Sequence, residues 1–108
     1  MRYLKKYEAS RNPKIGDYVI IDPHTPVKEV EDWILNHIGQ IIDVEMDFST
    51  DRYRYTVKYE NIPKGWEDHF SYDYHEKNIR RTYKFGIEHY SKNKEDLERI
   101  IAINKYNL

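Results

Sequence analysis

Residues 51–61, DRYRYTVKYEN, predict the central strand of the fold. Apolar and aromatic side chains occupy every second position, namely Tyr53, Tyr55, Val57 and Tyr59. The positions between them carry polar and charged side chains. Strict alternation with aromatic and β-branched residues is typical of a strand that has one buried and one solvated face. We therefore expect these four side chains to face the core.

The preceding residues predict an antiparallel partner for this strand. Five apolar side chains share one parity: Ile38, Ile42, Val44, Met46 and Phe48. Acidic side chains alternate with them: Asp43, Glu45 and Asp47. When the two strands are paired through a turn at 49–51, this acidic row lies opposite a basic row: Arg52, Arg54 and Lys58. Such cross-strand pairs contribute roughly 0.2–1 kcal/mol each, and a slip by one residue would bury the charges. We therefore interpret the acidic row as a partner of the basic row and not as a metal site.

Two further elements are expected before this hairpin. Residues 17–22 predict the first strand, with apolar side chains on both faces, so we expect a terminal helix to cover its second face. Residues 26–35 predict a helix, with Thr25 as its N-cap and Pro26 at the first helical position. One face of this helix is apolar: Val27, Val30 and Ile34.

After the central strand, the sequence predicts two more strands and a second helix. Alternation resumes over residues 66–74, and residues 78–83, NIRRTY, predict a fifth short strand that Gly86 ends. Residues 91–108 predict a helix that begins with a polar cap, Ser91 or Asn93. The inner stripe expected for this helix is Leu97, Ile100, Ile101 and Asn104.

Composition limits the classes of function. The chain has 108 residues, of which 34% are charged, and a formal net charge of −1, so no overall charge draws it toward nucleic acid or an acidic membrane. The lack of cysteine excludes disulfides, thiolate zinc sites and cysteine nucleophiles. No apolar run approaches a membrane span, and the first ten residues lack the apolar region of a secretory signal. We expect a soluble cytoplasmic protein without a cofactor.

The chain contains 11 tyrosines against 3 phenylalanines and 2 tryptophans. A tyrosine ring is apolar but has a polar tip, so it suits two situations. One is a thin core whose rings reach the surface, which we favour because small sheets cannot fully bury large rings. The other is an aromatic binding surface.

The predicted elements describe a mainly β, α+β fold: a five-stranded SH3-like small barrel with a helical insertion after its first strand and a C-terminal helix. The segments KIGDYVIID, IGQIIDV, YTVKYEN and NIRRTY resemble the strands of SH3-like, Tudor and KOW-type barrels. More loosely, the chain resembles short uncharacterised proteins of large tailed bacteriophages, which would place it in the host cytoplasm. The resemblance implies a single domain over residues 1–108, with the barrel at about 14–83 and the helix at about 91–106.

The first function class is a protein-binding module. An insertion between the first two strands of a small barrel lies near its mouth, where partners usually bind. The resemblance therefore points to residues 26–37, within which Trp33 and His37 are the candidate contacts. A tryptophan at this place is more often a lid packed on the barrel than a ligand contact. An aromatic cage for methylated cations is disfavoured, because its candidate rings take the core parity.

Nucleic-acid binding is the alternative function. Four basic residues lie close together near the end of the predicted barrel and alternate with aromatic rings: Lys77, Arg80, Arg81 and Lys84. Cations hold phosphates, and neighbouring aromatic rings such as Tyr83 and Phe85 stack on bases. The simpler interpretation is that these cations solvate a terminal strand, and the near-neutral charge of the chain favours it.

A toxin-type ribonuclease barrel is a second alternative, because some of these enzymes begin with a similar Gly-Asp strand. We find no convincing set of catalytic residues to accompany that strand. On one strand His69 and His75 lie roughly 20 Å apart, too far to share a metal. The sequence therefore favours a non-enzymatic module that binds a macromolecule, protein first and nucleic acid second, with no metal site.

Overall fold

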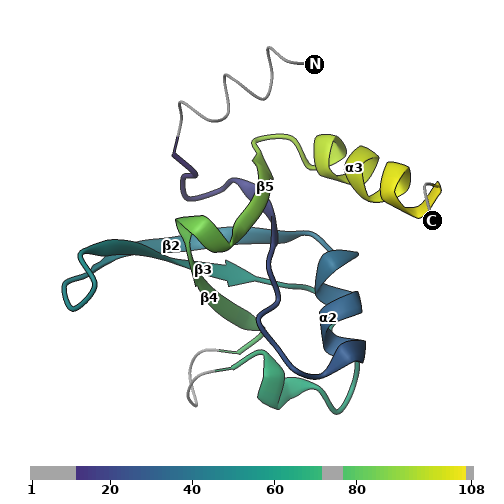
Figure 1. Cartoon of the computed structure of the whole chain (residues 1–108), viewed down its shortest axis with the longest axis horizontal. Coiled ribbons are helices and arrows are strands. Elements are labelled where there is room, and N and C mark those ends of the chain that lie inside the picture. Colours follow the sequence, from purple (N-terminus) through teal and green to yellow (C-terminus); the bar gives the residue numbers. More distant parts are fainter. Residues whose placement is uncertain (1–11, 72–76, 107–108) are drawn as a thin grey trace.

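A five-stranded antiparallel sheet and two α-helices make up the part of the chain that the computed structural model describes, residues 12–71 and 77–106 (Figure 1). The strands are β1 (Tyr18–Ile21), β2 (Gly39–Asp47), β3 (Arg52–Lys58), β4 (Ile79–Tyr83) and β5 (Ile87–Ser91). The helices are α2 (Lys28–Leu35) and α3 (Lys94–Tyr106), and two short 3₁₀ turns are η1 (Glu67–His69) and η2 (Lys84–Gly86). The predicted α+β class is confirmed, and the fold has five strands and two helices as expected, but β5 takes the place of the strand predicted over 66–74.

The strands lie in the order β4-β3-β2-β1-β5, and every pairing is antiparallel. Within the described residues no pairing joins β4 to β5, so the sheet is open and its closure into a barrel stays a prediction. The strand β5 follows the range 14–83 that the sequence assigned to the barrel. This strand was not predicted, because Gly86 reads as a break and the five residues after it mix polar and apolar side chains.

A β-bulge in β2 sets the register of the central hairpin. Ile41 pairs with Val57, but the next pair joins Asp43 to Thr56, so Ile42 is the extra residue. A bulge reverses the parity of a strand at one point. Ile41 is therefore buried and Ile42 is 44% exposed, and the prediction that Ile42 faces the core is wrong.

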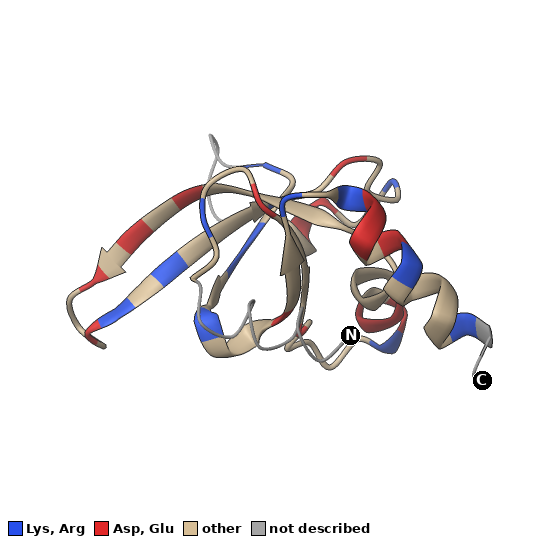
Figure 2. Cartoon of the chain, turned by 90° about the horizontal axis from the view of Figure 1, so that it is seen from above, with Lys and Arg blue, Asp and Glu red and all other residues tan. Residues whose placement is uncertain are grey.

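Beyond the bulge, the hairpin follows the predicted parity. Glu45 lies opposite Arg54, and their side chains form an ion pair of 2.7 Å. Asp47 lies opposite Arg52, and Figure 2 shows the acidic and basic residues side by side along the two strands. Asp43 continues the same register and lies opposite Thr56, whereas Lys58, beyond the bulge, pairs with Gln40. The charge-matched hairpin face is thus confirmed for its outer part.

The hairpin formed by β2 and β3 extends past the body of the protein, because β1 pairs only with the first two residues of β2 (Figure 1). Tyr55, Val57 and Tyr59 of the central strand are buried, as predicted. Tyr53 lies further along the projecting part and is 54% exposed, so its assignment to the core is wrong. Phe48, in the turn, is 90% exposed for the same reason.

The main core lies between one face of the sheet and α2. Its buried members are Val19, Ile21, Val30, Ile34, Ile41, Tyr55, Val57, Tyr59 and Phe70. Ile20 points to the other face of β1 and is also buried. The helix α3 contacts β1 and β5 and buries Leu97, which confirms the prediction that a terminal helix covers a second face.

Three predicted boundaries are wrong. The helix α2 begins at Lys28 with Val27 as its N-cap; Thr25 instead accepts a hydrogen bond from the Val27 amide (3.3 Å), which forms a turn before the helix. Val27 is 38% exposed because it precedes the first turn. The helix α3 begins at Lys94, directly after Asn93, the second of the two predicted caps, and not at Ser91, which still belongs to β5.

The third correction concerns the strand predicted over 66–74. The described part of this segment forms η1 and a single bridge between Ser71 and Lys77, while residues 72–74 lie outside the described residues. Pro63 accepts a backbone hydrogen bond from Trp66 (3.1 Å), and Trp66 accepts one from His69 (2.9 Å). These successive turns occupy the carbonyls that a strand ladder needs.

Gly39 allows β2 to pass close to the core. A Cβ atom at this position would overlap Cγ1 of Val57 and lie 3.0 Å from Cζ of Tyr59. We expect Gly39→Ala to lower the free energy of unfolding by about 1–3 kcal/mol, the usual cost of overpacking. Urea unfolding followed by circular dichroism measures it. Asp43→Ala, on the exposed side of the same strand, is the control with a change below about 0.5 kcal/mol; equal stability of the two variants would contradict the packing account.

Candidate functional site

Trp33 is the centre of a group of packed rings. Its ring stacks on His37, with centroids 4.0 Å apart, and meets the edges of Trp66 at 6.3 Å and Phe70 at 5.4 Å. It also contacts the ring of the buried Tyr59, at 5.6 Å. Trp33 is half-buried and forms a lid on the main core, the alternative that the sequence left open.

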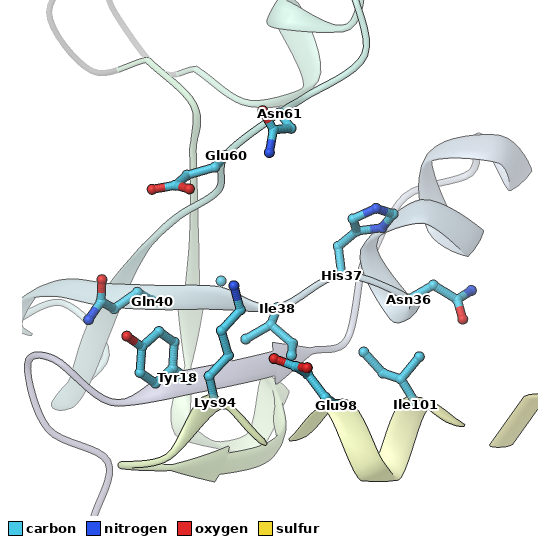
Figure 3. A pocket seen from close by; sticks show the side chains of 11 residues that line it. Tyr18, Asn36, His37, Ile38, Gln40, Glu60, Asn61, Lys94, Glu98 and Ile101 are labelled. Atoms are coloured by element: carbon cyan, nitrogen blue, oxygen red, sulfur yellow. The ribbon is translucent and has the colours of Figure 1, made fainter. Parts of the chain in front are cut away.

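His37 is exposed, and its Nδ1 lies 2.7 Å from the carbonyl oxygen of Trp33. It lines a cavity of about 530 Å³ between the end of α2, the start of β2 and α3 (Figure 3). The side chains around this cavity carry both charges: Lys94 and Glu98 come from α3, and Glu60 lies across from them. Because opposite charges and neutral amides alternate around it, the cavity favours no one class of ligand.

The basic residues of the 77–84 segment do not form one patch. Arg80 and Arg81 are neighbours on β4, so their side chains point to opposite faces of the sheet. Lys77 and Lys84 lie roughly 20 Å apart at the spacing of an extended chain. Lys84 donates a hydrogen bond to the Asn12 side chain (2.7 Å).

Arg80 holds three segments together. Its guanidinium donates to the carbonyl oxygens of His69 (2.8 Å) and Pro23 (2.6 Å), and it lies 5.7 Å from the ring centroid of Phe70. These contacts use the planar fork of the side chain within the fold. The role predicted for Arg80 on nucleic acid therefore has no support in its geometry.

A second cavity, of about 490 Å³, lies where β4 ends beside β3, and we call it the aromatic groove. Its lining residues are Asn12, Arg52, Tyr53, Tyr55, Tyr83, Lys84 and Phe85. The last pair between β3 and β4 is Arg54 with Tyr83, after which the chain turns away as η2. The groove therefore runs along the part of β3 that β4 leaves uncovered.

Aromatic rings and cations meet at this groove. The rings of Tyr83 and Phe85 are nearly parallel, at 13°, with centroids 5.7 Å apart. The Arg52 guanidinium lies 5.2 Å from the Phe85 centroid, a cation–π distance. Despite these two contacts Phe85 is 67% exposed, so a large apolar ring is held at the surface.

The turn of the hairpin is tied to the rim of the groove through Asp47. The Ser49 hydroxyl donates to one carboxylate oxygen (2.6 Å), and the Tyr83 hydroxyl donates to the other (2.6 Å). These bonds, first that of Ser49 and then that of Tyr83, lower the pKa of Asp47 to about 2. The same bond to Asp47 raises the pKa of Tyr83.

A tight turn presents Phe85. A Cβ atom at Gly86 would overlap Oγ1 of Thr82, so glycine lets η2 fold back against β4. The sequence drew attention to Tyr83, Lys84 and Phe85 but missed Arg52 and Tyr53. The only signal for those two was their place at the start of a strand, next to a turn.

Among residues 12–71 and 77–106, no three or more His, Asp or Glu side chains are placed to hold a metal ion. No helix in the same ranges is long and apolar enough to cross a membrane. His75, one of the histidines considered from the sequence, lies outside the described residues.

No protein-family model, curated protein or solved structure showed a significant match to this chain.

The contacts of Arg80 lead to a test of its role in the fold. Arg80→Lys keeps the charge but cannot reach both carbonyl oxygens, so we expect the free energy of unfolding to fall by about 1–3 kcal/mol. Urea unfolding measures this change. Lys77→Ala, at an exposed position of the same basic segment, should alter stability by less than about 0.5 kcal/mol. An Arg80→Lys protein as stable as the unsubstituted one would show that the guanidinium is not a clamp.

The lowered pKa of Asp47 predicts a loss of stability in acid. The unfolded carboxyl binds its proton near its ordinary pKa of 3.8, whereas the folded one binds it only near 2. Stability from this group is therefore complete above about pH 4 and decreases as the pH falls toward 2. Carboxyl carbon shifts in an NMR titration should give a midpoint near 2 for Asp47, and Ser49→Ala should raise it. A midpoint unchanged by Ser49→Ala would contradict the assigned cause.

Proposed function

We propose that the protein is a non-enzymatic binding module that engages a macromolecular partner, most favourably a protein, through the aromatic groove. The observation that carries this proposal is the exposed ring of Phe85, held beside Tyr53 and Arg52 over a preformed hollow. Aromatic and arginine side chains dominate the binding energy of protein interfaces. A group of exposed rings is informative where a single exposed apolar residue is not.

The SH3-like barrel remains part of this proposal. Two observations support it: each strand from β1 to β4 pairs with the next in the chain, and β5 returns to pair with β1. The 3₁₀ turn η2 joins β4 to β5 and brings the last two strands to opposite edges of the sheet. Small folds of this kind commonly place binding residues on their connecting segments.

Contact through Trp33 and His37 stays a prediction with weaker support. Four neighbouring rings surround Trp33, which explains its presence without a partner. His37 is exposed but lines a cavity of mixed charge. The aromatic groove combines apolar area and one sign of charge, so we place the main contact there.

Nucleic-acid binding remains the second candidate. Arg52 and Lys84 lie beside rings on which a base can stack. The acidic residues of the same hairpin oppose a polyanion, among them Glu45 and Asp47. Protein is therefore the favoured partner.

Site-specific photocrosslinking tests the proposal. A photoreactive benzoylphenylalanine replaces Phe85 in the full chain, which is then irradiated in a lysate of the cells in which the gene is normally expressed. We expect discrete adducts that protease removes and nuclease leaves unchanged. Adducts removed by nuclease would identify the second candidate instead.

Two further positions serve as controls for this experiment. Ile103, which is 56% exposed on α3, lies outside the groove and should give no matching adducts. Trp33 reports on the insertion. If position 85 gives no adducts beyond those of position 103, the groove is not the contact surface; adducts from position 33 alone would restore the insertion as the contact.

A further inference from the structure

We infer that the aromatic groove binds an extended peptide segment in which a carboxylate side chain lies beside a large apolar or aromatic residue. This inference rests on the proposed function and names the chemistry of the partner. It combines three properties of the groove: its position at a strand edge, its apolar lining and its two cations.

The position of the groove favours an extended chain. Arg52 and Tyr53 lie beyond the last residue pair between β3 and β4, so among the described residues no strand pairs with this end of β3 on that side, where Phe85 of η2 lies beside Arg52. A peptide strand placed there continues the sheet in the space that β4 leaves. Phe85 and Tyr83 form the opposite wall and offer ring faces and edges to a side chain of the peptide.

The charges of the groove specify the acidic residue. Among the described residues, Arg52 and Lys84 form no ion pair: the contact of Arg52 is the Phe85 ring, and that of Lys84 is the neutral Asn12 oxygen. Although Asp47 lies opposite Arg52 in the sheet, neither cation has a described carboxylate within 4.0 Å, and the two flank an apolar hollow. A carboxylate seated between them gains charge-assisted hydrogen bonds, and arginine binds it through two parallel ones.

The same charges argue against a polyanion. A nucleic acid brings one phosphate per nucleotide, and each phosphate contact needs its own cation. The groove supplies two cations, whereas Glu45 and Asp47 lie on the same hairpin, and Arg80 is engaged within the fold. One acidic side chain in a peptide satisfies both cations and adds no further negative charge.

Selection from a random dodecapeptide library tests the inference. The library is displayed on phage and selected on the immobilised full-length protein, and in parallel on Phe85→Ala. Phe85 is mostly exposed, so this variant should fold, as its thermal unfolding curve will verify. We expect the sequences specific to the unsubstituted protein to carry Asp or Glu within two positions of Trp, Tyr, Phe or Leu.

The charge requirement is then measured on one selected peptide by fluorescence polarisation. Replacing Arg52 and Lys84 by glutamate should weaken its binding at least tenfold. Lys64→Glu, a charge reversal at an exposed position outside the groove, should change the affinity by less than twofold. Replacing the acidic residue of the peptide by its amide should weaken binding to the unsubstituted protein in the same way.

The outcomes separate this inference from the proposed function. Selected peptides that depend on Phe85 but lack acidic residues would overturn the inference and leave the proposed function standing. No enrichment relative to Phe85→Ala would overturn both. Two other occupants are checked directly. Binding of a labelled single-stranded oligonucleotide is measured by fluorescence polarisation, and binding of a second copy of the chain by analytical ultracentrifugation. If either binds and Phe85→Ala abolishes that binding, that occupant replaces the peptide.

Discussion

The bulge at Ile42 is the constraint on which the rest of the structure depends. One extra residue in β2 lets Ile41 and Val44 lie opposite Val57 and Tyr55, so two segments of opposite parity face the same core. Without it, either the start or the end of β2 would turn its apolar side chains to water. The close approach at Gly39 and the buried ring of Tyr59 complete this packing.

The aromatic groove follows from where the strands end. β4 stops opposite Arg54, and η2 folds back against it through Gly86, which carries Phe85 over the uncovered end of β3. The hairpin continues past this point: β1 pairs with β2 only at Gly39 and Gln40, whereas β2 and β3 stay paired as far as Asp47 and Arg52. The rings and cations of the groove are therefore held by β3, β4 and the turn η2, a favourable arrangement for binding when little ordering is needed.

The basic residues of the 77–84 segment have different roles in the structure. Arg80 joins Pro23, His69 and Phe70 as part of the fold, whereas Lys84 lies at the rim of the groove. The sequence grouped these cations because they are close along the chain. Their separation follows from strand alternation and from the path of the 59–71 segment, which brings the carbonyl oxygen of His69 to Arg80.

By itself, the sequence determined the elements whose signal is local: β1 to β4, both helices and the buried parity of Tyr55, Val57 and Tyr59. Periodicity and charge alternation depend only on neighbouring residues, so they can be read along the chain. The sequence also singled out Tyr83, Lys84 and Phe85, three of the seven residues that line the groove. Only the tertiary structure decided the bulge, the strand β5 and the exposure of Arg52 and Tyr53, because each depends on where a partner strand from elsewhere in the chain begins or ends.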